Sequence, residues 1–448
     1  MRRIASGVAL HDTRMLVDPL RTQTRAVLVG ALILITGLAG CFIFSLIRPS
    51  GVAGNDAILA DRSTAALYVK VGDRLHPVLN LASARLIVGR PDNPTTVKTS
   101  ELDKFARGNL LGIPGGPERM VQNTSRDAQW TVCDDSSGPG VTVIAGLLAT
   151  GGERAATLQA HHAVLVENQG RTWLLWDGRR SAINLTDRAV TDALGLGVDI
   201  PTPRPIAIGL FNAIPEGPAL TAPAIPRAGE PPQFPVSAPV GAVVAAYQAD
   251  NTIRYYAVLS DGLQPIPEVL AAILRNTNSF GFDQPPRLGA DEVARMPVAR
   301  VIDTGAYPAQ PVTLVDASDD PVTCAQWAKP EGATTNSLSL LSGAAVPLPD
   351  GLTTVALVGP PNRVALSPGT GYFVDSAASL FWVSDTGVRY GIEDAKTAAA
   401  LGLTSTPLPI PWSMLSQFAS GPTLSHADAL LAHDALPPDP KPAGSENP

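Results

Sequence analysis

One uncharged run of apolar residues constrains this chain more than any other feature. It extends over the 22 residues from Ala26 to Ile47, and a helix of this length, at about 1.5 Å per residue, crosses the roughly 30 Å hydrocarbon core of a bilayer. Five arginines and two aspartates precede the run, and this basic excess favours a cytoplasmic N-terminus. The sequence therefore predicts a cytoplasmic segment over residues 1–25, a transmembrane helix over residues 26–47 and a large domain beyond the membrane.

Two other interpretations of the run are a cleaved signal peptide and a lipoprotein signal. A signal peptide has an apolar stretch of only about 7–15 residues, followed by a small-residue cleavage site. Leu38–Cys41 (LAGC) matches a lipoprotein box, but apolar Phe42–Phe44 follows it, where a mature lipoprotein normally begins with polar residues. We therefore expect a retained anchor.

The rest of the chain has the composition of a folded domain with many turns. Of 448 residues, 45% are hydrophobic and 16% are charged, while 42 prolines and 40 glycines favour short elements. A net charge of −7 with only six lysines argues against a broad nucleic-acid-binding surface. We expect a linker over residues 48–60, a folded domain over residues 61–436 and a Pro-rich tail over residues 437–448.

Four segments of this domain share one pattern: an apolar strand, a glycine turn, a second short strand and a helix. Asp177-Gly178 and Asp261-Gly262 are typical of hairpin turns, because both residue types tolerate positive φ. The spacing of the segments is irregular, so they do not form a solenoid. The segments are Leu67–Gly89, Arg171–Leu196, Arg254–Arg275 and Phe381–Leu403, with turn glycines Gly72, Gly178, Gly262 and Gly387.

Strand-like pieces lie between these repeats and are joined by Pro-rich turns. We expect them to build a central sheet from which the four small modules project. The predicted fold is thus a single-pass membrane protein with a mixed α+β outer domain, in which four βα repeats surround a central β-sheet domain. The pieces are Gly140–Leu148, Val236–Tyr247, Pro311–Val315 and Thr353–Val358.

Two cysteines, Cys133 and Cys324, lie outside the apolar run, and Cys41 lies inside it. If the outer domain is exported into an oxidising compartment, the two outer cysteines can form one bridge. Closing a loop of about 190 residues would stabilise the fold by about 5 kcal/mol in the chain-entropy model. Their surroundings match in mirrored order, with Trp130 and Asp134-Asp135 flanking one cysteine and Asp319-Asp320 and Trp327 flanking the other. This order predicts two similar packing sites.

Five motifs along the chain are informative when taken together. They are His11–Arg21 (HDTRMLVDPLR), Asp61–Val69, Leu75–Leu86 (LHPVLNLASARL), Gly112–Gly115 (GIPG) and His433–Pro437. This combination resembles EccB, the single-pass core component of type VII (ESX) secretion systems, and most of all the EccB of the third ESX system. The resemblance extends over essentially the whole chain.

The resemblance implies a periplasmic domain of four repeats around a central β domain, with a disulfide that corresponds to Cys133–Cys324. It also implies a place in an inner-membrane complex with EccC, EccD and EccE, in which EccB forms dimers. The expected role is that of a structural core subunit. The family is often labelled an ATPase, so ATP is the one cofactor that the resemblance suggests.

The residues themselves contain no recognisable catalytic motif. A P-loop needs a Gly-Lys pair after a glycine-rich loop, and no such pair occurs. Trp173–Asp177 imitates a Walker-B strand, but Asp177 leads into a glycine turn. The pair His161-His162 predicts one surface and one buried histidine, since neighbours in a strand point to opposite faces. The acidic pairs Asp134-Asp135 and Asp319-Asp320 are interpreted as turn residues beside the bridge, so we expect no catalytic, cofactor or metal residues.

Two groups of residues are expected to contact the membrane or partner subunits. Gly30 and Gly37 are seven residues apart on one face of the predicted helix, where a second helix can approach closely. Arg14, Arg21 and Arg25 are expected to contact anionic lipid or partner subunits. The alternatives to a structural subunit are a nucleotide hydrolase with an unrecognised site and a cell-wall-binding module.

Overall fold

The computed structural model describes residues 19–47, 51–136, 138, 140–248, 252–358 and 362–433. Arg14 and the predicted tail over residues 437–448 lie outside the described residues. The chain divides into two compact units. The first contains Met1–Leu79, Asp92–Leu111 and Ala432–Pro448, and the second contains Asn80–Pro91 and Gly112–Leu431.

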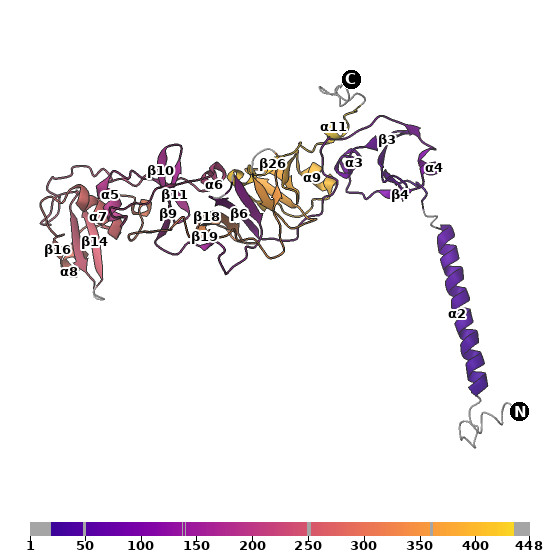
Figure 1. The fold of residues 1–448 in the computed structure, drawn as a ribbon, viewed down its shortest axis with the longest axis horizontal. Coiled ribbons are helices and arrows are strands. Elements are labelled where there is room, and N and C mark those ends of the chain that lie inside the picture. The colour runs from indigo at the N-terminus through magenta and orange to yellow at the C-terminus, as the bar shows by residue number, and fades with distance from the viewer. Residues whose placement is uncertain are drawn as a thin grey trace, which may run out of the picture. The chain divides into compact units, whose positions relative to one another are not determined.

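The first described element is a single long helix, α2, over Pro19–Ile47 (Figure 1). Proline suits a first helical turn, because its missing N–H would have no partner there. The stretch Gln23–Ile43 has a mean hydropathy of 2.5, none of it is buried, and it is long and apolar enough to cross a membrane. The predicted helix is therefore present, and it begins earlier than predicted.

The first unit also contains a five-stranded sheet, which we name module 1. Three consecutive strands form two antiparallel hairpins, and two later strands pair in parallel with the first and third of them. Leu59, Leu75 and Val97 are buried in its core. In spatial order the strands are β4 (Thr95–Val97), β1 (Ile58–Asp61), β2 (Leu67–Val71), β3 (Arg74–Val78) and β5 (Ala106–Arg107), and the short helix α4 (Thr99–Leu102) follows β4.

The same arrangement occurs three times in the second unit, as modules 2, 3 and 4. Each module has three antiparallel strands, a helix, a short strand that returns parallel to the first strand, and a second short helix. Module 2 comprises β9 (His162–Asn168), β10 (Arg171–Trp176), β11 (Arg179–Ala182), α5 (Arg188–Ala193), β12 (Arg204–Pro205), α6 (Ile208–Ala213) and β17 (Thr313–Leu314).

Module 3 repeats this order and is followed by a short 3₁₀ helix. It comprises β13 (Val243–Tyr247), β14 (Ile253–Val258), β15 (Leu263–Ile266), α7 (Glu268–Thr277), β16 (Arg287–Leu288), α8 (Ala290–Arg295) and η1 (Thr304–Ala306). Module 4 comprises β22 (Tyr372–Ser376), β23 (Ser379–Val383), β24 (Val388–Ile392), α9 (Ala395–Leu401), β25 (Leu408–Pro409), α10 (Trp412–Leu415) and β26 (Ala419–Ser420).

The four predicted repeat segments are confirmed, since each coincides with the second and third strands of a module and the helix that follows them. For module 1 that helix is α3 (Leu81–Val88), which belongs to the second unit. The sequence analysis assigned no first strand to any module, and it missed every return strand. The return strands have only two or three residues, too few for a pattern to develop. Strand β1 begins at Ile58, so the predicted linker over residues 48–60 extends too far at its C-terminal end.

The central sheet has seven strands, and its middle pair is antiparallel. The predicted strands Gly140–Leu148 and Thr353–Val358 do contribute to it. The other two predictions were wrong, because Val236–Tyr247 contains the first strand of module 3 and Pro311–Val315 contains β17, which pairs with β9. In spatial order the strands are β20 (Val355–Ala356), β21 (Arg363–Ala365), β7 (Val141–Ala145), β6 (Ala128–Asp135), β18 (Val322–Lys329), β19 (Ser337–Gly343) and β8 (Ala156–Thr157).

Helices join the modules of the second unit to the central sheet and to one another. Helix α6 packs on β6 and β18, α10 packs on β6, and α5 packs against α7 of the neighbouring module. Helix α3 (Leu81–Val88) packs against α9 and against α11 (His426–Ala429). Along the second unit, module 3 therefore adjoins module 2, and the central sheet lies between modules 2 and 4 (Figure 1).

Candidate functional site

The most constrained part of the molecule is the middle strand pair of the central sheet. Cys133 and Cys324 are directly opposite each other in the β6–β18 register, both are buried, and a disulfide joins them. Trp130 faces Trp327 in the same register. The mirrored sequence order of the two cysteine motifs thus reflects two antiparallel strands that face each other in one place, rather than two separate packing sites.

A buried ion pair links this strand pair to module 2. The Arg204 guanidinium lies 3.0 Å from the Asp134 carboxylate, and the two side chains are only 6% and 5% exposed. Arg204 also donates to the carbonyl oxygen of Pro321, beside β18, and the Ala207 N–H donates to Asp134 over 3.0 Å. Burial raises the pKa of Asp134, against the opposing effects of the Ala207 hydrogen bond and the Arg204 charge.

The interpretation of Asp134 as a turn residue was therefore wrong. It is the penultimate residue of β6, and its carboxylate accepts a hydrogen bond from the N–H of Ala207, the residue just before α6. The sequence signal that could have identified it is its apolar strand context, since a carboxylate in such a strand needs a buried cation. Asp319 lies in an exposed turn before β18, as predicted.

In each module, the side chain two positions after the turn glycine hydrogen-bonds to a distant part of the same module. The sequence analysis missed this role. This side chain reaches from the third strand to carbonyl groups at or beyond the end of the second short helix. Burial lowers the pKa of the two most enclosed of these cations, Arg180 and Arg389. The contacts are Arg74 to Arg107 O (3.1 Å), Arg180 to Phe211 O (2.7 Å) and Ile214 O, Gln264 to Ile302 O (2.6 Å), and Arg389 to Phe418 O (2.5 Å).

The turn glycines of modules 2 and 4 lie directly against the central sheet. A Cβ at Gly178 would lie 2.5 Å from the Leu338 carbonyl oxygen of β19, and one at Gly387 would lie 2.5 Å from a Val364 methyl group of β21. Both glycines also have positive φ. In module 3 the turn glycine has ordinary φ, and it is needed because a Cβ at Gly262 would lie 2.5 Å from the Pro297 carbonyl oxygen. Both predicted hairpins are therefore present, but the explanation by positive φ holds for Asp177-Gly178 only.

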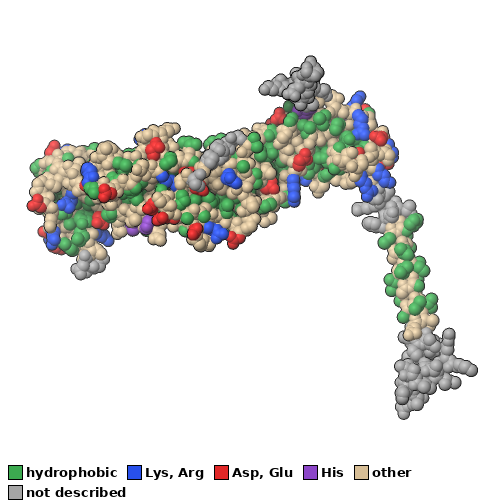
Figure 2. Space-filling view, in the orientation of Figure 1, with side chains coloured by type: hydrophobic (Ala, Val, Ile, Leu, Met, Phe, Trp, Pro, Cys, Tyr) green, Lys and Arg blue, Asp and Glu red, His purple; other side chains and the backbone are tan. Residues whose placement is uncertain are grey.

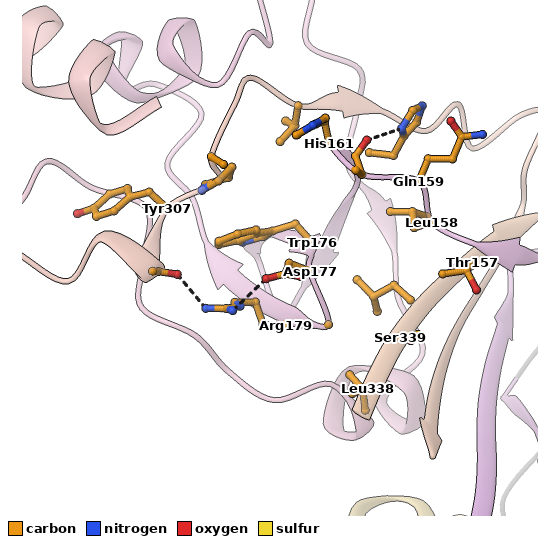
Figure 3. A pocket seen from close by; sticks show the side chains of 18 of the residues that line it. Thr157, Leu158, Gln159, His161, Trp176, Asp177, Arg179, Tyr307, Leu338 and Ser339 are labelled. Atoms are coloured by element: carbon orange, nitrogen blue, oxygen red, sulfur yellow. Dashed lines mark hydrogen bonds and ion pairs between the residues drawn. The ribbon is translucent and has the colours of Figure 1, made fainter. Parts of the chain in front are cut away.

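A cavity of about 640 Å³ lies where module 2 meets β19 and η1 (Figure 3). Arg179 lies over the Trp176 ring, 4.8 Å from its centroid, and binds both Asp177 (3.1 Å) and the Gly305 carbonyl oxygen (3.0 Å). Among the lining residues, Arg179 is the one with a permanent positive charge, and it is already paired. The lining thus contains neither lysines nor a glycine-rich loop that could bind the phosphates of a nucleotide.

The residues singled out for nucleotide or metal chemistry are part of ordinary structural elements. Trp173–Asp177 is strand β10 followed by a tight turn into β11, as predicted from the glycine. His161 is exposed with φ of 67° and precedes β9, while His162 is half-buried. The prediction of one surface and one buried histidine in a strand was therefore wrong. Among the described residues, no three His, Cys, Asp or Glu side chains form a metal-binding group.

In helix α2, Gly30 and Gly37 have open space where a Cβ would be. Arg21 precedes the apolar stretch Gln23–Ile43 of the same helix, and Arg25 lies near the N-terminal end of that stretch. These residues thus remain predicted contact positions for lipid or a partner helix.

Comparison with known proteins agrees with this architecture. A family model described as "Type VII secretion system ESX-1, transport TM domain B" matches residues 1–438. The chain is 69% identical to the ESX-3 secretion system ATPase EccB3 of Mycolicibacterium smegmatis, over 100% of this chain and 91% of the relative. It is 64% identical to EccB3 of Mycobacterium tuberculosis, over 99% of this chain and 89% of the relative.

Two solved structures are similar to it over most of their length. A structure of the EccB3 dimer from the ESX-3 core complex is 64% identical with a TM-score of 0.76, covering 84% of this chain and all of that chain. A structure of an intact ESX-5 inner membrane complex contains a chain that is 38% identical with a TM-score of 0.79, covering 99% of this chain and 95% of that chain. The apolar helix, the four like modules and the disulfide-bridged sheet, together with these matches, show that the chain belongs to the EccB family of type VII secretion proteins.

Proposed function

We propose that this chain is a structural subunit of a type VII (ESX) secretion complex in the inner membrane. In this proposal α2 spans the bilayer, residues 1–25 lie in the cytoplasm and the domain from module 1 onward lies in the periplasm. The observation that carries the proposal is the match to a chain in the structure of an intact ESX-5 inner membrane complex, which covers 99% of this chain at 38% identity. The buried disulfide supports an oxidising location.

The proposed partners are a second copy of the chain and the membrane subunits EccC, EccD and EccE. The related EccB3 structure is a dimer, and rigid modules on a bridged sheet suit a subunit whose surfaces bind other chains. Within the membrane, Gly30 and Gly37 are the proposed contact for another helix, because small residues let two backbones approach. Arg14, Arg21 and Arg25 are proposed to contact anionic headgroups or these partners on the cytoplasmic side.

Gentle solubilisation of membranes, affinity capture of the tagged chain and sizing of the eluate test this proposal. We expect a high-mass complex that contains EccC, EccD and EccE. The variant Gly30→Leu/Gly37→Leu is expected to lower the assembled fraction. Ala39→Leu is the matched control, because Ala39 lies on the opposite face of α2. A chain that elutes alone rejects the proposal, and equal effects of the two variants reject the glycine contact.

Nucleotide hydrolysis is the second candidate, because the related EccB proteins carry the name ATPase. The cavity beside Trp176 contains one paired arginine and no lysine, which favours the structural role. ATP turnover by the purified chain that is lost in Arg179→Gln, with the fold unchanged, would support hydrolysis at this cavity. We expect no turnover above that of this variant.

A further inference from the structure

Two exposed cations lie together at one edge of module 1. Arg62 follows strand β1 and Lys98 follows strand β4, and these strands pair in parallel with Asp61 opposite Val97. The Arg62 N–H donates to the Val97 carbonyl oxygen over 2.9 Å. The carboxyl ends of paired parallel strands meet at the same sheet edge, so the two basic residues are neighbours there.

The turn that carries these cations is held by a buried carboxylate. One oxygen of Asp61 accepts hydrogen bonds from the Ser63 N–H (2.8 Å), the Ser63 hydroxyl (2.7 Å) and the Thr99 hydroxyl (3.1 Å). These hydrogen bonds lower the pKa of Asp61. The carboxylate thus joins the residue after Arg62 to the residue after Lys98, so that both cations are carried by a fixed turn.

Neither cation has an acidic partner among the described residues. The acid nearest to Lys98 in sequence, Glu101, is half-buried and is paired with Lys104 at 2.6 Å. Asp61 is only 5% exposed and is occupied by its hydroxyl and amide donors. Lysine and arginine side chains also gather over other parts of this module (Figure 2). The edge is therefore an unneutralised positive patch.

The chain itself keeps this patch close to the membrane. Lys98 donates its backbone N–H to the carbonyl oxygen of Gly51 over 3.2 Å. Four residue steps separate Gly51 from Ile47, the end of α2, and they span at most about 14 Å. The headgroup layer on each side of the hydrocarbon core is about 5–8 Å deep. Even with this connection fully extended, the patch stays within about one Debye length, roughly 8–10 Å, of the lipid headgroups.

We propose that Arg62 and Lys98 bind the phosphate groups of anionic phospholipids in the leaflet at the C-terminal end of α2, and so dock module 1 on the membrane. The inference rests on the proposed spanning of the bilayer by α2. A basic residue near an anionic surface contributes about 1 kcal/mol, a factor of about 5 in the equilibrium constant, so the pair favours the docked state about 30-fold. Docking would fix the orientation of module 1 above the bilayer.

The full chain in lipid nanodiscs provides the test. A fluorophore at Ser100→Cys, in a Cys41→Ser background, reports on approach to headgroups through quenching by a headgroup-labelled lipid; Ser100 is exposed and close to Lys98. We expect strong quenching with phosphatidylglycerol present, weak quenching in pure phosphatidylcholine, and loss at high ionic strength. Arg62→Gln/Lys98→Gln is expected to shift the docked-to-free ratio about 30-fold, by the two contributions above.

The control variant Arg254→Gln/Lys396→Gln removes two exposed cations from modules 3 and 4 and should leave the quenching unchanged. Equal quenching in both lipids, or an equal effect of the control variant, would overturn the inference. Quenching abolished by inorganic phosphate, at an ionic strength at which sodium chloride leaves it intact, would also overturn it, in favour of a site for small anions. Failure of the chain to co-elute with nanodiscs would instead reject the membrane anchor itself.

Discussion

Removing the cation of the buried ion pair gives the sharpest test of how the central sheet is held to module 2. In Arg204→Met the Asp134 carboxylate keeps one donor, the Ala207 N–H, and loses the guanidinium at 3.0 Å. Breaking a buried pair by removing one partner costs about 3–5 kcal/mol, because a charge is left uncompensated. The Pro321 carbonyl oxygen also loses its donor. We expect the free energy of unfolding to fall by about 4 kcal/mol at neutral pH.

The pH dependence of this cost separates the electrostatic explanation from simple loss of packing. Burial already raises the pKa of Asp134, so the folded state binds this proton more tightly than the unfolded state does. The protonated Asp134 carboxyl therefore stabilises the folded state fully at pH values below the pKa that it has in the unfolded chain. This contribution is lost as the pH rises through the pKa that it has in the folded chain. Without Arg204 the folded pKa rises further. The cost of Arg204→Met should consequently shrink as pH falls from neutral towards 5.

Denaturant unfolding of the full chain in detergent, followed by tryptophan fluorescence, measures these quantities, since Trp130 and Trp327 are beside the strand pair. The double variant Asp134→Asn/Arg204→Met retains an acceptor for Ala207 and should recover about 2 kcal/mol of the loss. Equal costs for Arg204→Met at both pH values, or no recovery in the double variant, would refute the reasoning.

Three further outcomes are expected. Replacing Cys133 and Cys324 by serine should lower the unfolding free energy by about 5 kcal/mol under oxidising conditions and match the reduced wild type, and an unchanged denaturation midpoint would contradict this. Gly178→Val should cost at least about 2 kcal/mol, because it combines positive φ with a contact on β19, measured by thermal unfolding. Arg389→Met should cost about 2 kcal/mol, because two partly buried carbonyl groups, those of Ser416 and Phe418, lose a charged donor. The exposed control Arg254→Met should stay within about 0.5 kcal/mol.

The sequence predicts those parts of the fold that depend on the order of neighbouring residues. A strand, a glycine turn, a strand and a helix recur within about two dozen residues, and in two modules an aspartate, Asp187 or Asp394, caps the helix. The return strands could not be predicted in this way. They consist of two or three residues and exist only because a first strand far back in the chain offers them backbone partners.

Long-range pairing also explains the misassigned strands and the missed site residues. Val243–Tyr247 and Thr313–Leu314 are apolar like the central strands, and only their partners decide which sheet they join. The residues two positions after the turn glycines look like surface arginines or a surface glutamine in the sequence. Their acceptors are 29 to 38 residues away for Arg389 and Gln264, so their role appears only when the module is closed.

The bridged cysteines are 191 residues apart, and this separation determines when the bridge can form during the maturation of the protein. If the outer domain crosses the membrane while it is made, at about 5–20 residues per second, Cys133 emerges roughly 10–40 s before Cys324. Modules 2 and 3 must pass through in that interval, while the first thiol stays reactive towards any oxidant or foreign sulfhydryl it meets. The bridge therefore cannot form until modules 2 and 3 have crossed, and a chain stalled before Cys324 would be recognisable by one free thiol.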